Sequence, residues 1–313
     1  MTVDKDSLAI VIPYFNASKH ITKVVKKVSA YSNHIVIVDD CSPEKLPKDL
    51  FQLKNVSILH LEKNLGVGGA TLTGLKFFKD KKNIEVLIKV DADDQMDTAF
   101  IPELVNDVNN GFGFVKGNRF RDFKTLKQMP KMRRFGNFLL SFFSKVATGY
   151  WNLFDFNNGF FAISNKTFKQ IDSSYIKYNY FFETSLIAEL YYHRVSIKEI
   201  AMPAIYGDEK SNMKLMHMPM LFLKNLVKLF YRRLFRSYFV YDFNIGSIYM
   251  IFSFIFLFCG LTFGGYNWYK YSSQDLLTPL GTIMISTLLI ILGFQLLLQF
   301  IQFDILNTPK NDK

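Results

Sequence analysis

The sequence is poor in cysteine, since its 313 residues contain only Cys41 and Cys259. Two cysteines are too few for a disulfide framework, and Cys259 lies inside a long apolar run, so no bridge between them is expected. This usage is typical of a protein that faces a reducing compartment, which predicts a cytoplasmic setting. The first seven residues are short and polar, and they do not form the pattern of a signal peptide.

Acidic residues are in the minority. The chain has 38 Lys and Arg against 27 Asp and Glu, a formal net charge of +11 at pH 7. This excess suits an anionic partner such as nucleic acid, a membrane surface or a phosphorylated substrate. Basic and aromatic residues are not interleaved as in a known nucleic-acid-binding module, so we expect no nucleic-acid partner. The five histidines show no metal-ligand spacing.

Strand-like and helix-like segments alternate in the first half of the chain. Apolar runs predict strands over residues 8–13, 34–39, 56–61, 86–90 and 112–116. Helical spacing over residues 20–29 and 71–78 predicts helices between some of them. This order predicts an α/β fold, with a Rossmann-like and mostly parallel sheet covered on both faces. Ligands of such sheets bind beyond the carboxyl ends of the strands.

Two long runs near the C-terminus, residues 245–266 and 280–303, contain no charged residue. About 22 residues at about 1.5 Å each span roughly 33 Å, enough to cross the hydrocarbon core of a bilayer. The short connection between them predicts a two-helix transmembrane hairpin. Two buried core helices are the alternative, but soluble helices rarely run this long without charge.

Basic residues flank these runs on one side. Only Lys270, offset by Asp275, lies in the connection. The positive-inside rule therefore predicts a multi-pass membrane protein with two spans, whose large N-terminal domain and both termini are cytoplasmic. The flanking basic residues are Lys224, Lys228, Arg232, Arg233 and Arg236 before the first span, and Lys310 and Lys313 after the second.

Residues 217–240 carry a basic stripe with a period of four residues, opposite an apolar face. This pattern is typical of a helix in the headgroup layer of an anionic membrane, although a helix packed on the soluble domain is the alternative. The expected organisation is a catalytic domain over residues 1–214, a juxtamembrane amphipathic region over 215–243, the hairpin over 244–304 and a tail over 305–313.

An acidic cluster follows the fourth predicted strand, with Asp91 and Asp93 one residue apart. Carboxylates so placed converge on a hard cation such as Mg²⁺ or Mn²⁺, whose remaining positions are filled by phosphate and water. Such a metal neutralises charge on a leaving diphosphate. A solvated acidic loop is the alternative. An EF-hand calcium loop is excluded because its glycine and glutamate positions are not matched.

A set of short motifs appears in order along residues 10–214. They lie at residues 12–16, 38–42, 64–70, 91–95 (D-A-D-x-Q), 117–119 (G-x-R), 131–144 (K-R-x-x-S), 155–160 (D-x-x-x-G-F), 182–183 (the start of F-x-x-E) and 207–214 (G-x-S-K). Together these motifs resemble those of the family 2 glycosyltransferases with the GT-A fold. Within that family the resemblance is strongest to polyprenol-phosphate sugar synthases, the group of dolichol-phosphate mannose synthase.

The resemblance implies roles for individual residues. Asp40 would accept hydrogen bonds from the base or ribose, and Asp93 and Gln95 would hold the metal, with Asp91 as a further ligand. Basic residues would contact the phosphates, because the leaving group develops negative charge. The remaining implied contacts are Pro13, Phe15 and Val38 around the nucleoside, Asp91 and Ala92 near the ribose and diphosphate, and Arg119 with either Lys210 or Lys214 at the phosphates.

The sequence departs from the mannose synthases at several motif positions. Phe15 and Ala17 stand where those enzymes usually have Tyr and Glu, and Phe161 and Ala162 follow the G-F pair where they have an arginine. These departures favour a relative that uses another nucleotide-sugar.

The acceptor decides whether a general base is needed. A lipid phosphate is already a dianionic nucleophile at neutral pH, since its second pKa is about 6. It needs positioning by a metal and by cations, for which Arg133 and Arg134 are candidates. A sugar hydroxyl needs a base, and Glu183 is the first candidate and Asp155 the second. The alternatives are a helix-start charge for Glu183 and a turn residue for Asp155.

The expected function is metal-dependent, inverting transfer of a hexose from a UDP- or GDP-sugar to a polyprenyl phosphate at the cytoplasmic membrane face. A family 2 transferase that glycosylates a hydroxyl of a lipid-linked or surface glycan is the first alternative. An inactive nucleotide-sugar-binding membrane scaffold is the second. A processive polysaccharide synthase is disfavoured because the Q-x-x-R-W motif is missing. A homo-oligomer is compatible with the sequence.

Overall fold

The computed structural model describes residues 4–121, 131–203 and 218–311, with the backbone alone at residues 132, 133 and 218–221. The predicted G-x-S-K segment, with Lys210 and Lys214, lies outside the described residues. Internal contacts divide the chain into two compact units. The first comprises Met1–Phe230 with Pro309–Lys313, and the second comprises Tyr231–Thr308.

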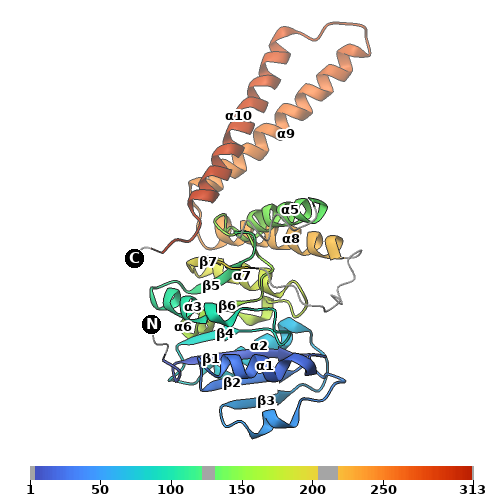
Figure 1. The fold of residues 1–313 in the computed structure, drawn as a ribbon. Helices are drawn as coiled ribbons and strands as arrows, with labels where there is room; N and C mark the ends of the chain where they lie inside the picture. The colour runs from blue at the N-terminus through green and yellow to red at the C-terminus, as the bar shows by residue number, and fades with distance from the viewer. Residues whose placement is uncertain (1–3, 122–130, 204–217, 312–313) are drawn as a thin grey trace. The chain divides into compact units, whose positions relative to one another are not determined.

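A seven-stranded sheet forms the centre of the first unit (Figure 1), with the order β3-β2-β1-β4-β6-β5-β7. Neighbouring pairs are parallel except for β4 with β6 and β5 with β6. The predicted α/β class and mostly parallel sheet are confirmed. The strands are β1 (Leu8–Tyr14), β2 (His34–Asp39), β3 (Val56–His60), β4 (Val86–Lys89), β5 (Phe114–Asn118), β6 (Phe161–Ser164) and β7 (Ile197–Ala201).

Two short strands, β6 and β7, were not predicted from the sequence. β6 has only four residues, so its apolar run is too short to identify by periodicity. It enters the sheet antiparallel between β4 and β5, with Ile88 opposite Ala162. This insertion places the chain just before Phe161 at the carboxyl ends of β1, β2, β4 and β5.

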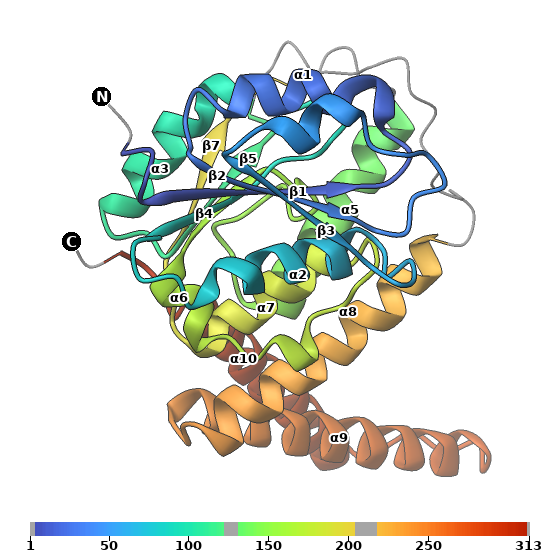
Figure 2. The same ribbon diagram turned by 90° about the horizontal axis from the view of Figure 1, so that it is seen from below.

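Helices cover both faces of the sheet (Figure 2) because the central strands are apolar on both sides. Leu8, Ile10 and Ile12 of β1 pack in one core with α1 (Ser18–Val28) and α3 (Ile101–Asn109). Ala9 and Val11 pack in the other core with α2 (Val67–Lys79), α6 (Asn165–Gln170) and α7 (Phe182–Tyr192). The predicted helices 20–29 and 71–78 correspond to α1 and α2, with boundaries shifted by a few residues.

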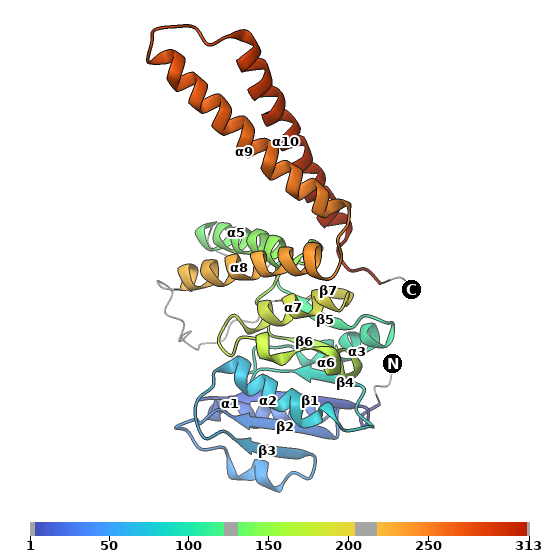
Figure 3. The same cartoon turned by 180° about the vertical axis from the view of Figure 1, so that it is seen from behind.

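Two further helices, α5 (Lys131–Thr148) and α8 (Met218–Phe235), lie side by side in Figures 1 and 3. Within the first unit they share a third apolar cluster with α7, to which Ala147, Ala188 and Leu226 contribute. Five large apolar residues of α5 are exposed, namely Phe135, Phe138, Leu139, Phe142 and Phe143, and of these Leu139 and Phe143 line the cavity described below. An exposed apolar area of this kind marks an interaction surface.

The second unit contains two long apolar helices, α9 (Ile245–Ser272) and α10 (Leu280–Leu306), which pack against each other as a hairpin. Both are long and apolar enough to cross a membrane, and their composition suggests membrane anchoring. They approach closely at small residues. A Cβ at Gly264 would lie 2.2 Å from Ser286 Oγ, and this hydroxyl donates to the Gly260 carbonyl over 2.9 Å.

A buried ion pair connects the start and end of the second unit. The Arg233 guanidinium donates to both carboxylate oxygens of Asp304, over 2.5 and 3.0 Å, and the Tyr238 hydroxyl donates to the same carboxylate over 2.7 Å. Both partners are about 2% exposed. Arg233 was expected only as a flanking positive charge. Its pairing with Asp304, 71 residues away, follows from the return of α10 to the start of the hairpin.

Candidate active site

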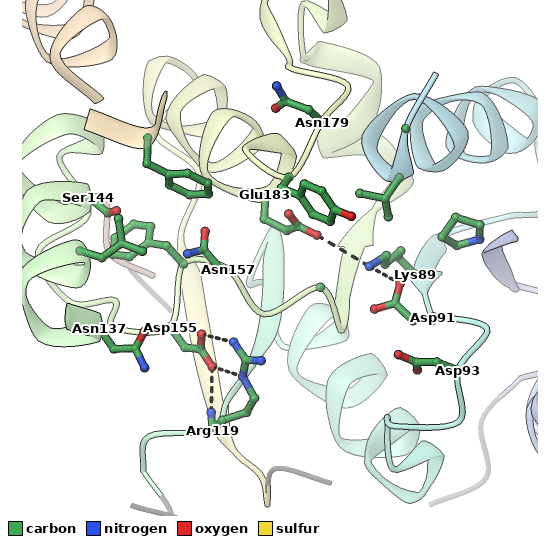
Figure 4. A pocket seen from close by; sticks show the side chains of 18 of the residues that line it. Lys89, Asp91, Asp93, Arg119, Asn137, Ser144, Asp155, Asn157, Asn179 and Glu183 are labelled. Atoms are coloured by element: carbon green, nitrogen blue, oxygen red, sulfur yellow. Dashed lines mark hydrogen bonds and ion pairs between the residues drawn. The ribbon is translucent and has the colours of Figure 1, made fainter. Parts of the chain in front are cut away.

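The polar residues that follow β1, β2, β4 and β5 meet at one edge of the sheet, because these four strands run in the same direction. A cavity of about 1410 Å³ opens at this edge (Figure 4). All its lining residues belong to the first unit. The lining includes charged groups from the loops after strands, and apolar side chains from α5 and α8.

Lys89, the last residue of β4, is fully buried and directs its ammonium group into the cavity between two carboxylates. Its Nζ lies 2.6 Å from Asp91 Oδ1 and 3.7 Å from Glu183 Oε1. Glu183 stands in the first turn of α7, on a different element from Asp91. The Gly159 backbone passes so close that a Cβ there would lie 2.2 Å from Lys89 Nζ. Gly159 therefore makes room for this cluster.

Burial and charge act in opposite directions on these groups. Burial disfavours the Lys89 ammonium, but the nearby Asp91 and Glu183 carboxylates outweigh it, so the pKa of Lys89 is raised. Burial also raises the pKa of Glu183, and the Lys89 charge offsets only part of this effect. A carboxyl group with a raised pKa in a cavity is a candidate for proton transfer.

Asp155 is held by Arg119, the first residue after β5. The Arg119 side chain donates to Asp155 Oδ2 and Oδ1 over 2.8 Å each, and its backbone N–H donates to Oδ2 over 3.0 Å. Burial opposes the Asp155 charge, but the Arg119 guanidinium outweighs it and lowers the pKa of Asp155. Both carboxylate oxygens are thus occupied, and an acid of lowered pKa is a weak base. Between the two candidates for a general base, the geometry favours Glu183.

Asp40 follows β2 and supports the glycine-containing loop before α2. Its oxygens accept hydrogen bonds from the backbone N–H groups of Leu65 and Gly66, over 2.7 and 2.8 Å. Gly66 has a φ of +83°, and a Cβ there would lie 2.8 Å from the Tyr178 carbonyl oxygen. Glycine at this position therefore satisfies both the backbone conformation and the close approach.

The loop after β4 carries the candidate metal ligands. Asp93 Oδ1 accepts a hydrogen bond from the Gln95 backbone N–H over 3.0 Å, and Asp91 and Asp93 both line the cavity. Between them and Gln95 the chain turns at Asp94, whose φ is +60° and whose carboxylate pairs with Lys23 and Lys27 of α1 over 2.7 and 2.6 Å. Salt bridges from α1 therefore hold this turn.

The donor set fits a hard divalent cation. Asp91 and Asp93 offer two carboxylates, and Mg²⁺ in phosphoryl sites is usually held by one or two carboxylates together with substrate phosphates and water. Among the described residues no group of three or more His, Cys, Asp and Glu side chains is placed to bind a metal by itself. A cation at this loop would therefore depend on ligands from the donor substrate.

The wall of the cavity formed by α5 is mostly apolar, unlike the charged wall formed by the loops after the strands. Asn137 and Ser144 lie on this wall, across the cavity from Asp91 and Asp93 (Figure 4). The hydroxyl oxygens of Ser141 and Ser144 are buried and make no hydrogen bond within the described part of the chain. Apolar side chains surround them, namely Leu139, Leu140 and Phe143 of α5 and Phe222, Leu223 and Leu226 of α8.

The structure brings most of the site residues named from the sequence into this one cavity. Val38, Gln95 and Arg134 are not in its lining. The Val38 side chain is fully buried in the core beside α2, and Arg134 is half-buried on α5. The side chain of Arg133 lies outside the described residues. The named residues that line the cavity are Pro13, Phe15, Asp40, Asp91, Ala92, Asp93, Arg119, Asp155 and Glu183.

Sequence reasoning missed the buried lysines. Lys89 lies in the cavity, and Lys116 of β5 is buried and donates a hydrogen bond to the Asp155 carbonyl oxygen. Both interrupt apolar strand runs, Val86–Lys89 and Phe114–Asn118. A buried lysine must be paired with an acceptor or an opposite charge. A lysine inside an apolar strand that is followed by carboxylates, as Lys89 is, was therefore the signal that could have indicated a buried ion pair. Ser144 ends the K-R-x-x-S segment that was named from the sequence, whereas Ser141 carried no comparable signal.

This fold is an α/β domain with a polar-lined cavity at the carboxyl ends of its parallel strands, the edge at which such domains bind ligands. Residues 9–172, more than half of the chain, match the sequence profile of glycosyl transferase family 2. The chain belongs to this family and is a glycosyltransferase with a GT-A domain.

Two relatives match about two thirds of the chain. An uncharacterized protein of Methanocaldococcus jannaschii is 31% identical over 212 residues, which cover 66% of this chain and 84% of the relative. The UDP-N-acetylglucosamine–dolichyl-phosphate N-acetylglucosaminyltransferase of Methanococcus voltae is 29% identical over 220 residues, covering 64% of this chain and 86% of that enzyme.

The fold is similar to that of glucosyl-3-phosphoglycerate synthase from Mycobacterium tuberculosis, solved with Mn²⁺, UDP-glucose and phosphoglyceric acid. The TM-score is 0.54 at 14% identity, over 71% of this chain and 79% of that one. At this identity the likeness establishes the fold alone.

Proposed function

We propose that this glycosyltransferase transfers a hexose, with inversion, from a nucleotide-sugar to a polyprenyl phosphate, and that it requires Mg²⁺ or Mn²⁺. One observation carries the proposal. A single cavity has carboxylates and Arg119 on one wall, and on the other wall two buried hydroxyls surrounded by apolar side chains of α5 and α8. The first wall suits a metal-bound diphosphate, and the second suits a polar group at the end of a hydrocarbon chain.

The donor would bind beside β1, β2 and β4. Phe15 and Pro13 offer apolar surface to a nucleoside, and the loop that Asp40 supports lies next to it. Asp91 and Asp93 would hold the cation, whose chemistry when bound is to neutralise charge on the leaving diphosphate. Arg119 is held in place by Asp155, and its exposed part faces the cavity with a fixed positive charge. In the same proposal, either Lys210 or Lys214 adds a further positive charge at the phosphates.

A lipid phosphate acceptor needs little activation, because it is largely dianionic at neutral pH. The protein would then position it, with Ser141 and Ser144 offering hydrogen bonds and Arg133 and Arg134 offering charge near the start of α5. The named activity of the Methanococcus voltae relative, transfer to dolichyl phosphate, supports this acceptor class. It also makes UDP-N-acetylglucosamine the first donor to test.

A second acceptor class is favoured by Glu183. This carboxyl is buried, its pKa is raised by burial, and it lines the cavity between the two walls. A base is required to take the proton from a sugar hydroxyl, and Glu183 has the environment of one. A family 2 transferase that glycosylates a hydroxyl of a lipid-linked glycan is therefore the second candidate.

The membrane arrangement is part of the proposal. We place the catalytic domain over residues 1–214 and the juxtamembrane region over 215–243, followed by the two spans and a short tail. The basic residues on α8 and after α10 favour a cytoplasmic position for the domain and both termini. The exposed phenylalanines of α5, such as Phe135 and Phe142, would add apolar contact with the membrane surface.

A radiolabel transfer assay tests the proposal. The full chain in detergent is incubated with Mn²⁺, undecaprenyl phosphate or dolichyl phosphate, and in separate reactions UDP-N-acetylglucosamine, UDP-glucose and GDP-mannose. We expect label in a lipid-extractable product with one of the donors, and loss of that product in Asp93→Ala. A matched control is Asp97→Ala, because Asp97 caps the Ala99 N–H in the same loop and does not line the cavity.

The outcomes separate the two acceptor classes. A labelled lipid monophosphate sugar whose formation survives Glu183→Gln supports the lipid phosphate. Metal-dependent donor hydrolysis without a lipid product, lost in Glu183→Gln, moves the acceptor to a hydroxyl. Binding of Mn²⁺ and nucleotide without any turnover would instead support the inactive scaffold.

A further inference from the structure

We propose that Lys89 is a positioning residue that holds the carboxylates of Asp91 and Glu183 in one arrangement across the cavity. The candidate metal-binding loop after β4 and the start of α7 would then be fixed relative to each other. The inference rests on the proposed function in that it assigns Asp91 to the donor and Glu183 to the acceptor side. The contacts themselves are properties of the protein without substrate.

The position of Lys89 supports this role. It ends β4, and two residues later Asp91 begins the loop that carries the candidate metal ligands. Glu183 comes from α7, which packs on one face of the sheet and lies 94 residues along the chain from Lys89. The ammonium of Lys89, within 2.6 Å of one carboxylate and 3.7 Å of the other, is the group that connects these two elements.

The free energy of such a cluster depends on all its members. Lys89 is 1% exposed and Glu183 is 7% exposed, so neither charge is well solvated. Removal of the ammonium would leave two carboxylates facing each other near the further negative charge of Asp93. Repulsion between them would move Asp91 or Glu183, or would favour a protonated carboxyl. A neutral side chain at position 89 would therefore change the placement of both carboxylates at once.

A comparison with Lys116 distinguishes Lys89 from a lysine that only fills a buried site. Both are fully buried in strands that run in the same direction, Lys89 at the end of β4 and Lys116 in the middle of β5. Lys116 donates to a backbone carbonyl, that of Asp155, and does not line the cavity. Lys89 instead pairs with two side-chain carboxylates that do line it. Lys116 is therefore the matched control.

The test uses four variants of the full chain in detergent: Lys89→Met, Glu183→Gln, the double variant, and Lys116→Met. The first readout is thermal unfolding without metal or nucleotide. We expect the double variant to lose less stability than the sum of the two single losses, because removal of both partners leaves no unpaired buried charge between them.

The second readout is the affinity for UDP, measured by calorimetry with and without Mn²⁺. Loss of a residue that orients a metal ligand typically weakens metal binding by about tenfold or more. We expect Lys89→Met to weaken Mn²⁺-dependent UDP binding by about tenfold, and Lys116→Met to leave it unchanged within about twofold. If the transfer assay identifies a GDP-sugar as the donor, the affinity for GDP is measured in place of that for UDP.

These readouts decide the inference independently of the acceptor, since neither requires turnover. Additive stability losses, or Mn²⁺-dependent binding that Lys89→Met leaves intact, would overturn it. If Lys89→Met alone does not yield folded protein, recovery of folded protein in the double variant supports the coupling, and failure in both overturns it. A failed transfer assay with an intact coupling would refute the proposed acceptor and leave Lys89 as the positioning residue.

Discussion

Replacement of Asp304 by asparagine should strongly destabilise the α9–α10 hairpin. The carboxylate accepts two hydrogen bonds from the Arg233 guanidinium and one from the Tyr238 hydroxyl, in a site where both ions are about 2% exposed. Hydrogen bonds to charged groups contribute about 1.5–3 kcal/mol each, and removal of one partner of a buried pair costs about 3–5 kcal/mol. We therefore expect Asp304→Asn to lower the free energy of unfolding by about 3–5 kcal/mol.

The hairpin can be followed by itself, because the chain has two tryptophans and one of them, Trp268, lies on α9. In a Trp151→Phe background, Trp268 fluorescence reports unfolding of the hairpin in mixed micelles of increasing SDS content. Asp275→Asn is the matched control. Asp275 is exposed in the connection of the same hairpin, so its replacement should change the free energy by less than about 0.5 kcal/mol.

A double replacement examines the reason for the loss. Apolar residues of similar volume can substitute for a buried ion pair at little cost, because the charges no longer need to leave water. Arg233→Met with Asp304→Leu should therefore recover most of the stability that Asp304→Asn loses. A double variant as unstable as the single one would refute the reasoning, since the loss would then arise from packing rather than from an unpaired charge.

Three further predictions concern the catalytic domain. Asp155→Asn should lower the free energy of unfolding by about 3 kcal/mol at neutral pH. Because Arg119 outweighs burial and lowers the pKa of Asp155, this contribution is complete above the ordinary value of 3.8 and is lost as the pH falls through the lowered value. Thermal unfolding of both proteins across this pH range should show the difference shrinking in acid, and a constant difference would contradict it. Asp40→Ala should remove the two hydrogen bonds to the loop before α2, at a cost of about 2–4 kcal/mol, and raise KM for the donor. An unchanged KM would show that the loop is not part of the donor site. Removal of divalent cations with EDTA should abolish transfer, and added Mn²⁺ should restore it in the wild type but not in Asp93→Ala; transfer that survives EDTA would contradict a metal requirement.

Much of the fold was accessible to sequence reasoning because it is encoded locally. The strands Leu8–Tyr14 and His34–Asp39 are continuous apolar runs bounded by polar residues, and the α/β class follows from their alternation with helices. The two hairpin helices can be recognised in the sequence by the length of their apolar runs and by the absence of charge in them. The loop residues Asp40, Asp91 and Asp93 could be named as candidate site residues because they closely follow strands.

Pairing across the chain was not encoded in this way. From the sequence, Asp155 could be interpreted equally as a turn residue or as a general base. Its bidentate contact with Arg119 and its lowered pKa distinguish it from Glu183. The antiparallel entry of β6 between β4 and β5 carries the Asp155–Gly159 loop to the edge where the other strands end. No periodicity in residues 155–164 indicates this position.

The sequence by itself determined the class of domain, the apolar two-helix hairpin and the acidic loop, because the pattern that predicts each of them involves residues close together in the sequence. Only the tertiary structure decided which charges face one another, as with Lys89 between Asp91 and Glu183, or Arg233 with Asp304. The physical reason is that the energy of a buried charge depends on the distance to its partner in space, and residues far apart in sequence reach that distance only when the sheet and helices have packed.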